Sequence, residues 1–265
     1  MGAATVNIIC MKWGTLYGPE YVNHLRAGVA RHLTRPHRFV CFTDDTSGLD
    51  ARVEARPLPA LDVPQGNLDL RWRKVAVFKA GLGGLGVLGG VTGPTLFLDL
   101  DLVIVDSIDI FFDLAGAFWV IRDDELFRSK PLRKLNPARD RFLHSVGNTS
   151  VFRFEIGAHA GIVDDYLADP VGVTTRFEIE QEYVSAWLDQ RGLLQYWPRE
   201  WCVSFKNHCV PRHVKSFAAD PVVPAGARIV VFAGTPKMSD VLAGGGHKWY
   251  RRIGNVDWLR AAWSA

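Results

Sequence analysis

The feature that most constrains this chain is the apolar run 96–105, LFLDLDLVIV, which carries two carboxylates in its middle. A continuous run of Leu, Ile, Val and Phe of this length is typical of a β-strand that is buried on both faces. Burial of an unpaired carboxylate is costly, so Asp99 and Asp101 each need a partner or a metal ion. Because residues two apart in a strand point to the same side, we expect both acids to project together and to bind one divalent cation.

The segments around this run predict a parallel α/β sheet. The expected strands are 6–11, 38–43, 53–58, 118–121, 151–154 and 228–232, and the expected helices are 19–33, 70–82, 162–167 and 179–188. Proline at the first helical position favours the helix that starts at Pro19, and Pro36 prevents its continuation. Strand, helix and strand joined by tight connections are typical of a parallel α/β sheet. We also expect the tryptophan-rich tail to pack back on the body, because nothing else would cover its rings.

Composition limits the cellular context and the partners. The chain has 265 residues, of which 48% are hydrophobic and 22% charged, and it shows no linker or internal repeat, so we predict one domain over 1–265. A net charge of +3 without a Lys/Arg run demands no nucleic-acid partner, and it leaves peripheral contact with an anionic membrane surface open. No segment predicts a signal peptide or a transmembrane span. We therefore expect a cytoplasmic protein.

One interpretation of the acidic run is a phosphatase. Asp99-Leu-Asp101-Leu-Val-Ile, followed by Asp106-Ser107, resembles the nucleophile motif of the haloacid-dehalogenase superfamily. In that superfamily the first Asp attacks phosphorus and the second is the general acid/base, with Mg²⁺ between them. That motif normally lies on the first strand, whereas a strand-helix-strand unit precedes it here. The acidic pair that completes the metal site later in such chains is also absent, so this interpretation ranks second.

A second resemblance covers most of the chain, roughly residues 5 to 240. An apolar strand that ends in Asp-x-Asp, after an N-terminal α/β half, resembles the metal-binding motif of GT-A-fold glycosyltransferases. The chain is especially similar to bacterial members near the retaining family that contains glycogenin and lipopolysaccharide galactosyltransferases. The fragments that carry this resemblance are KWG at 12–14 with Tyr17, FTDD at 42–45, Trp72 with Lys74, LDLD at 98–101, GNTSV at 147–151, EQEY at 180–183 and FAGTPK at 232–237. Their order, more than any one fragment, makes the case.

The resemblance implies a single GT-A domain with a mostly parallel central sheet flanked by helices. It implies a donor nucleotide half at about 1–105 and an acceptor half at about 106–265. The implied activity is metal-dependent transfer of a sugar from a nucleotide-diphosphate donor, UDP-linked by preference, to a glycan, lipid-linked or small-molecule acceptor. Retention of anomeric configuration is implied by the family alone. A non-catalytic nucleotide-sugar-binding module is a further alternative.

The metal site implied by the resemblance departs from the family in one ligand. Asp99 and Asp101 would hold Mn²⁺ or Mg²⁺, for which oxygen ligands are suited, and Asp99 would also approach the ribose. The family usually adds a histidine in the segment that ends in Gly-x-Pro/x-Lys, but Val231 and Ala233 occupy the corresponding positions. The candidate substitutes are water, His208 and His247.

The remaining donor contacts implied by the resemblance lie after the first two strands, before the acidic run and near residue 237. They are Lys12, Trp13 and Tyr17 for the base and ribose, Asp44 for the base or ribose, and Lys74 and Lys237 for the diphosphate or donor sugar. A sugar nucleotide leaves as an anionic diphosphate, so its departure needs a divalent ion and cationic side chains. For Asp44 a turn-forming role is the alternative.

The catalytic groups implied by the resemblance lie in two later fragments. Asn148 would line the donor sugar, and Glu180, Gln181 and Glu182 would lie near the anomeric carbon or the acceptor hydroxyl. The related family pattern is Asp-Gln-Asp, so both acids here are one methylene longer. The alternative role for these acids is to stabilise the first turn of a helix, where negative charge is favourable.

Overall fold

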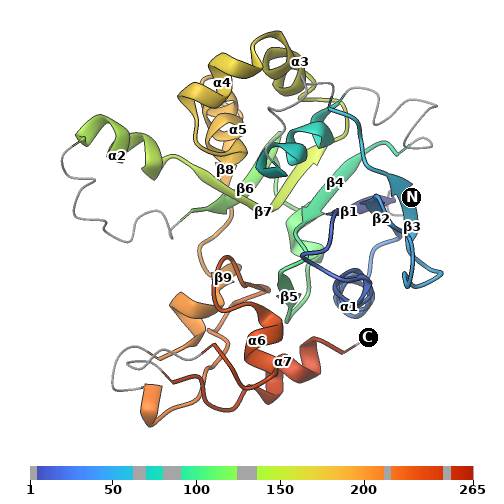
Figure 1. Cartoon of the computed structure of the whole chain (residues 1–265), viewed down its shortest axis with the longest axis vertical. Coiled ribbons are helices and arrows are strands. Elements are labelled where there is room, and N and C mark those ends of the chain that lie inside the picture. The colour runs from blue at the N-terminus through green and yellow to red at the C-terminus, as the bar shows by residue number, and fades with distance from the viewer. Residues whose placement is uncertain are drawn as a thin grey trace.

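Seven strands form a central sheet in the order β3-β2-β1-β4-β7-β6-β8 (Figure 1). They belong to a computed structural model that describes residues 5–61, 70–79, 91–123, 136–211, 216–246 and 252–264. The strands are β1 (Val6–Lys12), β2 (His37–Thr43), β3 (Glu54–Pro57), β4 (Pro94–Leu98), β6 (Phe118–Arg122), β7 (Gly147–Glu155) and β8 (Leu194–Tyr196). Only β7 runs antiparallel to its neighbours, β4 and β6. The α/β class and the mostly parallel sheet are therefore confirmed.

Helices cover both faces of this sheet. The α-helices are α1 (Pro19–His32), α2 (Pro137–His144), α3 (Gly161–Ala168), α4 (Pro170–Arg176), α5 (Glu180–Asp189), α6 (Met238–Leu242) and α7 (Asp257–Ala262). β1 shows the two layers: Ile8 and Cys10 pack with residues of α1, whereas Ile9 and Met11 pack with residues of α3 and α5. Neighbouring strand residues point to opposite faces, so a strand covered on both sides is apolar throughout. Among the described residues, no helix combines the length and hydropathy that crossing a membrane requires.

The acidic run 96–105 is not one strand, and here the sequence prediction is wrong. β4 ends at Leu98, and the chain resumes as β5 (Leu102–Ile104) in a second sheet of order β5-β10-β9, with β9 at Cys202–Ser204 and β10 at Ile229–Val231. The Asp99 N–H donates to the Ser150 carbonyl of β7 at 2.9 Å, whereas the Asp101 carbonyl accepts from the Phe232 N–H at 2.8 Å. The chain thus passes from one sheet to the other between the two acids. An apolar run alone does not distinguish one buried strand from two strands buried in different sheets.

The segment predicted as a helix over 70–82 also differs from expectation. It is a 3₁₀-helix, η1 (Leu70–Phe78), and residues 80–82 lie outside the described residues. Val75, Ala76, Val77 and Phe78 are all buried, so this segment packs on more than one side. An amphipathic α-helix would instead leave one face exposed.

The second sheet shares its core with the first. Ile104 of β5 and Ile229 of β10 are buried in the same apolar cluster as Ile8 of β1. Figure 1 shows this sheet in the lower part of the molecule, beside α6 and α7. Trp263, which follows α7, packs against Tyr21 of α1 at a ring-centroid distance of 5.0 Å, so the predicted return of the tail is confirmed for this residue. The division into a donor half and an acceptor half stays a prediction.

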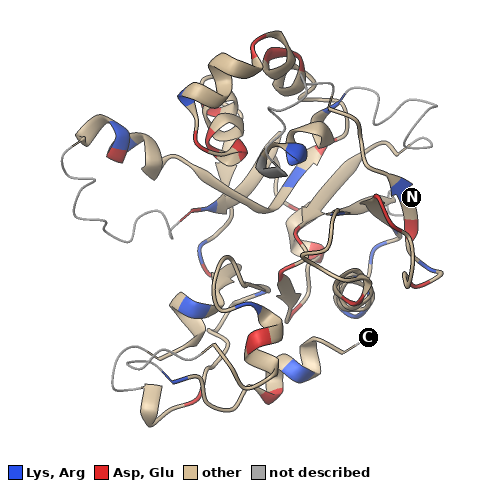
Figure 2. Cartoon of the chain, viewed as in Figure 1, with Lys and Arg blue, Asp and Glu red and all other residues tan. Residues whose placement is uncertain are grey.

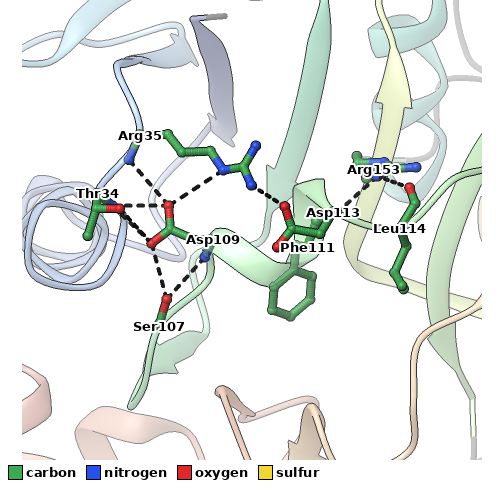
Figure 3. Close-up of polar contacts among 8 residues, drawn as sticks. All are labelled: Thr34, Arg35, Ser107, Asp109, Phe111, Asp113, Leu114 and Arg153. Carbon is green, nitrogen blue, oxygen red and sulfur yellow. Dashed lines mark hydrogen bonds and ion pairs between the residues drawn. The ribbon is translucent and has the colours of Figure 1, made fainter. Parts of the chain in front are cut away.

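A polar network anchors the segment that follows β5 (Figure 3). The Asp109 carboxylate of the 3₁₀-helix η3 (Asp109–Phe112) accepts from the backbone N–H groups of Thr34 and Arg35. From the other side, the Arg153 guanidinium of β7 donates to the carbonyls of Phe111, Leu114 and Gly116 at 3.1, 2.7 and 2.8 Å. Arg153 is only 8% exposed. One buried cation therefore satisfies three carbonyls in and just after η3.

Replacing Arg153 by Met should lower the free energy of unfolding by about 3 kcal/mol, because three carbonyls lose a charged donor. Urea denaturation measures this change. The matched control is Arg52→Met, since the Arg52 side chain is 68% exposed and pairs with nearby Asp50. That control should leave the free energy of unfolding close to the wild-type value, because exposed ion pairs contribute little. Equal stability of the two variants would show that the Arg153 contacts contribute nothing beyond what water supplies.

Candidate functional site

A cavity of about 650 Å³ opens at the carboxyl ends of β1, β2 and β4. The crevice outside the carboxyl ends of parallel strands is the usual ligand site of an α/β sheet. Many residues predicted from the sequence line it together: Lys12, Trp13, Tyr17, Asp44, Lys74, Asp99, Asp101 and Glu180. Arg73, which sequence reasoning missed, lines it as well. The carboxyl ends of neighbouring strands meet at one sheet edge, so residues far apart in the chain converge there.

Lys74 organises the inner wall of this cavity. Its ammonium lies 2.8 and 2.9 Å from the two carboxylate oxygens of Asp99, donates to the Thr149 carbonyl at 3.1 Å and lies 3.9 Å from Glu180 Oε1. The Thr149 hydroxyl donates to the same Glu180 oxygen at 2.6 Å. These contacts join η1, the end of β4, β7 and α5. Thr149 was missed from the sequence, although it stands next to the predicted Asn148.

The charges of this wall depend on each other. Burial by itself would lower the pKa of Lys74, but attraction by Asp99 and Glu180 outweighs it, so the pKa is raised and the side chain stays cationic. Burial raises the pKa of Glu180, and Lys74 and the Thr149 hydroxyl offset part of that rise. A buried carboxylate of this kind is easier to protonate than an exposed one.

Asp101 is held from the opposite side by Tyr17 and Lys237. The Tyr17 hydroxyl donates to Asp101 Oδ2 at 3.0 Å and accepts from Lys237 Nζ at 2.7 Å. Lys237 Nζ lies 3.7 Å from the same Asp101 oxygen. Burial raises the pKa of Asp101 and the charge of Asp99 adds to the rise, while Lys237 and the Tyr17 hydrogen bond counteract it. This contact places the predicted diphosphate lysine beside the acidic pair.

The acidic pair suits a divalent cation that a bound diphosphate helps to hold. Mg²⁺ and Mn²⁺ prefer oxygen ligands, and Mg²⁺ commonly takes one or two protein carboxylates plus substrate phosphates. Asp99 and Asp101 line the same cavity, but within the described ranges no third His, Cys, Asp or Glu joins them in a metal-ligating group. His208 Nδ1 accepts from the Ser204 N–H, and the residue lines a different cavity. His247 lies outside the described residues.

The first turn of α5 directs its three predicted side chains to different places. Glu180 lines the large cavity, whereas Gln181 Nε2 donates to Asp123 Oδ2 at 2.5 Å. The Glu182 side chain is 2% exposed and binds Arg139 Nη2 at 2.6 Å, which ties α2 to α5. Residues i, i+1 and i+2 of a helix point in different directions, so one cavity cannot receive all three.

Asn148 and Asp44 have local partners as well. Asn148 Oδ1 accepts from the Ser150 N–H at 3.0 Å, and the residue lines a smaller cavity of about 40 Å³ together with residues of β9 and β10. Asp44 Oδ2 accepts from the Gly14 N–H at 3.0 Å, where Gly14 adopts a φ of +60° that favours glycine. Asp44 therefore shapes the loop after β1 while it lines the large cavity.

Charged side chains are interspersed over the rest of the molecule. In the view of Figure 2, acidic and basic positions are scattered among each other on the helices and loops around both sheets. This agrees with the small net charge of +3. The acidic and basic groups of the large cavity differ from these other charges in their burial and in their contacts with one another. Ion pairs between exposed side chains contribute little to stability.

Two crystal structures of the galactosyltransferase LgtC resemble this chain in fold. One, a complex with donor and acceptor sugar analogs, matches with a TM-score of 0.56 at 13% identity, over 88% of this chain and 88% of that one. The other, an active-site mutant of LgtC in which glutamine is replaced by glutamate, matches with a TM-score of 0.54 at 11% identity, over 97% and 95% of the two chains. No protein-family model and no curated protein sequence matches the chain. The similarity confirms the GT-A fold that the sequence resemblance implies.

Replacing Asp101 by Asn should stabilise the metal-free protein by about 1 kcal/mol at about pH 8, because a carboxylate buried beside Asp99 is ionised at a cost. The folded pKa is raised, so the folded wild type binds the proton more readily than the unfolded chain. The contribution of Asp101 to wild-type stability therefore rises as pH falls through its raised pKa, and the advantage of the variant shrinks. Urea denaturation of both proteins at about pH 8 and about pH 4.5 measures the gap.

The control for this variant is Asp106→Asn, whose side chain is 56% exposed and pairs with Arg228. It should show no stabilisation at either pH. A less stable Asp101→Asn protein at about pH 8 would contradict the prediction, since it would mean that Tyr17 and Lys237 more than offset the cost of burial.

Proposed function

We propose that this protein is a metal-dependent glycosyltransferase that uses a nucleotide-diphosphate sugar, UDP-linked by preference. The observation that carries the proposal is the cavity at the carboxyl ends of β1, β2 and β4, where Asp99 and Asp101 lie and are paired with Lys74 and Lys237. A sugar nucleotide departs as a diphosphate, and its developing charge needs positive groups placed in advance. LgtC, whose fold this chain shares, is named a galactosyltransferase and was crystallised with donor and acceptor sugar analogs.

In this proposal Asp99 and Asp101 would hold Mn²⁺ or Mg²⁺ beside the donor diphosphate. The metal supplies charge neutralisation to the leaving diphosphate. Lys237 lies 3.7 Å from Asp101 and adds a second positive charge on the same side. Lys74, which is enclosed by Asp99, Thr149 and Glu180, holds the acids in place.

The nucleoside would occupy the part of the cavity that the loop after β1 lines. Lys12, Trp13 and Tyr17 lie there, and Asp44 holds the loop through the Gly14 N–H. Aromatic rings suit a base because they offer a flat apolar surface with a polar tip. The ligand is then bound between this loop and the acidic pair.

The reacting sugar would lie near the first turn of α5. Glu180 lines the cavity there, and Gln181 follows it in the helix. The LgtC mutant that replaces glutamine by glutamate is described as an active-site mutant, so LgtC has a glutamine in its active site. We propose the corresponding role for Gln181. We further propose that Asn148, in the small cavity, contacts sugar or acceptor, and that the transfer proceeds with retention. The Glu182 carboxylate, being paired with Arg139, supports the helix.

The acceptor class and the location are proposed from the sequence. A glycan, a lipid-linked intermediate or a small molecule suits an acceptor side built from loops. We propose a cytoplasmic enzyme, and contact with an anionic membrane surface would accompany a lipid-linked acceptor.

Calorimetry with UDP, with and without Mn²⁺, tests the proposal. We expect Mn²⁺ to strengthen UDP binding in the wild type, and Asp101→Ala to weaken the Mn²⁺-dependent binding at least about ten-fold, or about 1.4 kcal/mol. The matched control is Asp106→Ala, because Asp106 lies close in sequence but pairs with Arg228 at the surface. It should bind UDP and Mn²⁺ as the wild type does.

The alternatives give different results in the same assay. Failure to bind UDP in either condition, together with hydrolysis of a generic phosphomonoester, would favour the phosphatase. UDP binding without any turnover of UDP-glucose or UDP-galactose in the presence of metal and candidate acceptors would favour the non-catalytic binding module.

A further inference from the structure

The side-chain amide of Gln181 has a fixed orientation that follows from its partner. Gln181 Nε2 lies 2.5 Å from Asp123 Oδ2. An ionised carboxylate accepts hydrogen bonds and donates none, so the amide group facing it has to be the NH₂ and not the oxygen. The carbonyl oxygen of Gln181 is consequently the atom left for another partner.

Asp123 is well placed to impose this orientation. It directly follows β6, its N–H donates to the Val146 carbonyl at 3.2 Å, and it is 4% exposed. It lines the small cavity together with Asn148, whereas Glu180, which precedes Gln181, lines the large cavity. The Asp123–Gln181 hydrogen bond therefore links a residue of the small cavity to the helix turn whose Glu180 lines the large cavity.

This hydrogen bond is not needed to hold α5 in place. The helix is already attached by the Glu182–Arg139 ion pair at 2.6 Å and by the Tyr183 hydroxyl, which donates to the Ile162 carbonyl at 2.7 Å. The Ser185 hydroxyl also accepts from the Gly147 N–H at 2.8 Å. What the Asp123 contact adds is control of one side-chain torsion, the rotation of the Gln181 amide.

We propose that Asp123 is a positioning residue that turns the carbonyl oxygen of Gln181, and not its NH₂ group, toward the reacting sugar. The inference rests on the proposed function. An amide oxygen in this position accepts from a sugar hydroxyl or stabilises positive charge that develops at the anomeric carbon, whereas an NH₂ group opposes that charge. An unrestrained Gln181 amide would rotate, and for part of the time its NH₂ group would face the reacting sugar.

The kinetic test uses Asp123→Leu, Asp123→Asn and the control Glu178→Gln. Glu178 carries an 81% exposed carboxylate just before α5. The probes are UDP binding by calorimetry and hydrolysis of UDP-glucose and UDP-galactose in the presence of Mn²⁺. We expect UDP to bind every variant within about two-fold of wild type, while turnover of Asp123→Leu falls about 10²-fold, the cost typical of a misplaced reacting group. Asp123→Asn should give a turnover between those of the wild type and Asp123→Leu, because its amide can accept from Gln181 Nε2 but can also turn and donate to the Gln181 oxygen.

The contrary outcomes are distinct. Wild-type turnover in Asp123→Leu, or a loss in Asp123→Asn as large as in Asp123→Leu, overturns the positioning role and leaves the proposed function standing. Parallel loss of UDP binding and turnover also overturns it, because a general structural role would act on both. A wild type that neither binds UDP nor turns over either sugar nucleotide overturns the proposed function itself.

A second measurement is independent of turnover and of the folding of any one variant. In protein labelled with ¹⁵N at the glutamine side chains, Gln181→Glu identifies the Gln181 NH₂ signal by its loss. A hydrogen bond to a carboxylate should displace one proton of that NH₂ group downfield, and Asp123→Leu should return it to the position of a free amide. An NH₂ signal that already has the free-amide position in the wild type, and that Asp123→Leu leaves unchanged, overturns the inference.

Discussion

The structure depends on the point at which the chain leaves one sheet for another. The Asp99 N–H binds Ser150 of β7, and the Asp101 carbonyl binds Phe232, which follows β10, so the two acids contact different sheets although one residue separates them. Leu100 between them is buried, which anchors the crossing in the core. Carboxylates at such a crossing reach a cavity at the sheet edge, whereas a strand interior would enclose them in apolar surroundings.

Contacts between charges of opposite sign keep this arrangement intact. Lys74 neutralises Asp99 and the neighbouring Glu180, and Lys237 with Tyr17 partly neutralises Asp101. Burial still raises the pKa of Asp101, so this carboxylate binds a proton more readily in the folded protein than in the unfolded chain. Sites built for a cation or a charged ligand commonly retain such a cost, because stability and function favour different residues there.

Sequence reasoning succeeded where a local pattern carries the information. The continuous apolarity of residues 6–11 follows from a strand covered on both faces, and Pro19 marks the start of α1 as a proline at the first helical position does. The sequence prediction failed at the acidic run, because an apolar pattern indicates that residues are buried but not to which sheet they belong. It also grouped Glu182 with Glu180, although the helix turns these two side chains toward different partners, Arg139 and Lys74.

The sequence by itself determined the α/β class, the resemblance to the GT-A fold and most of the residues that line the large cavity, because strand periodicity and the order of short motifs are properties of the chain alone. The tertiary structure decided the partners of those residues. Lys237 meets Tyr17 across 220 positions of the chain, and Gln181 meets Asp123 across 58. No periodicity links residues so distant, since their contact depends on how two sheets and a helix pack against each other.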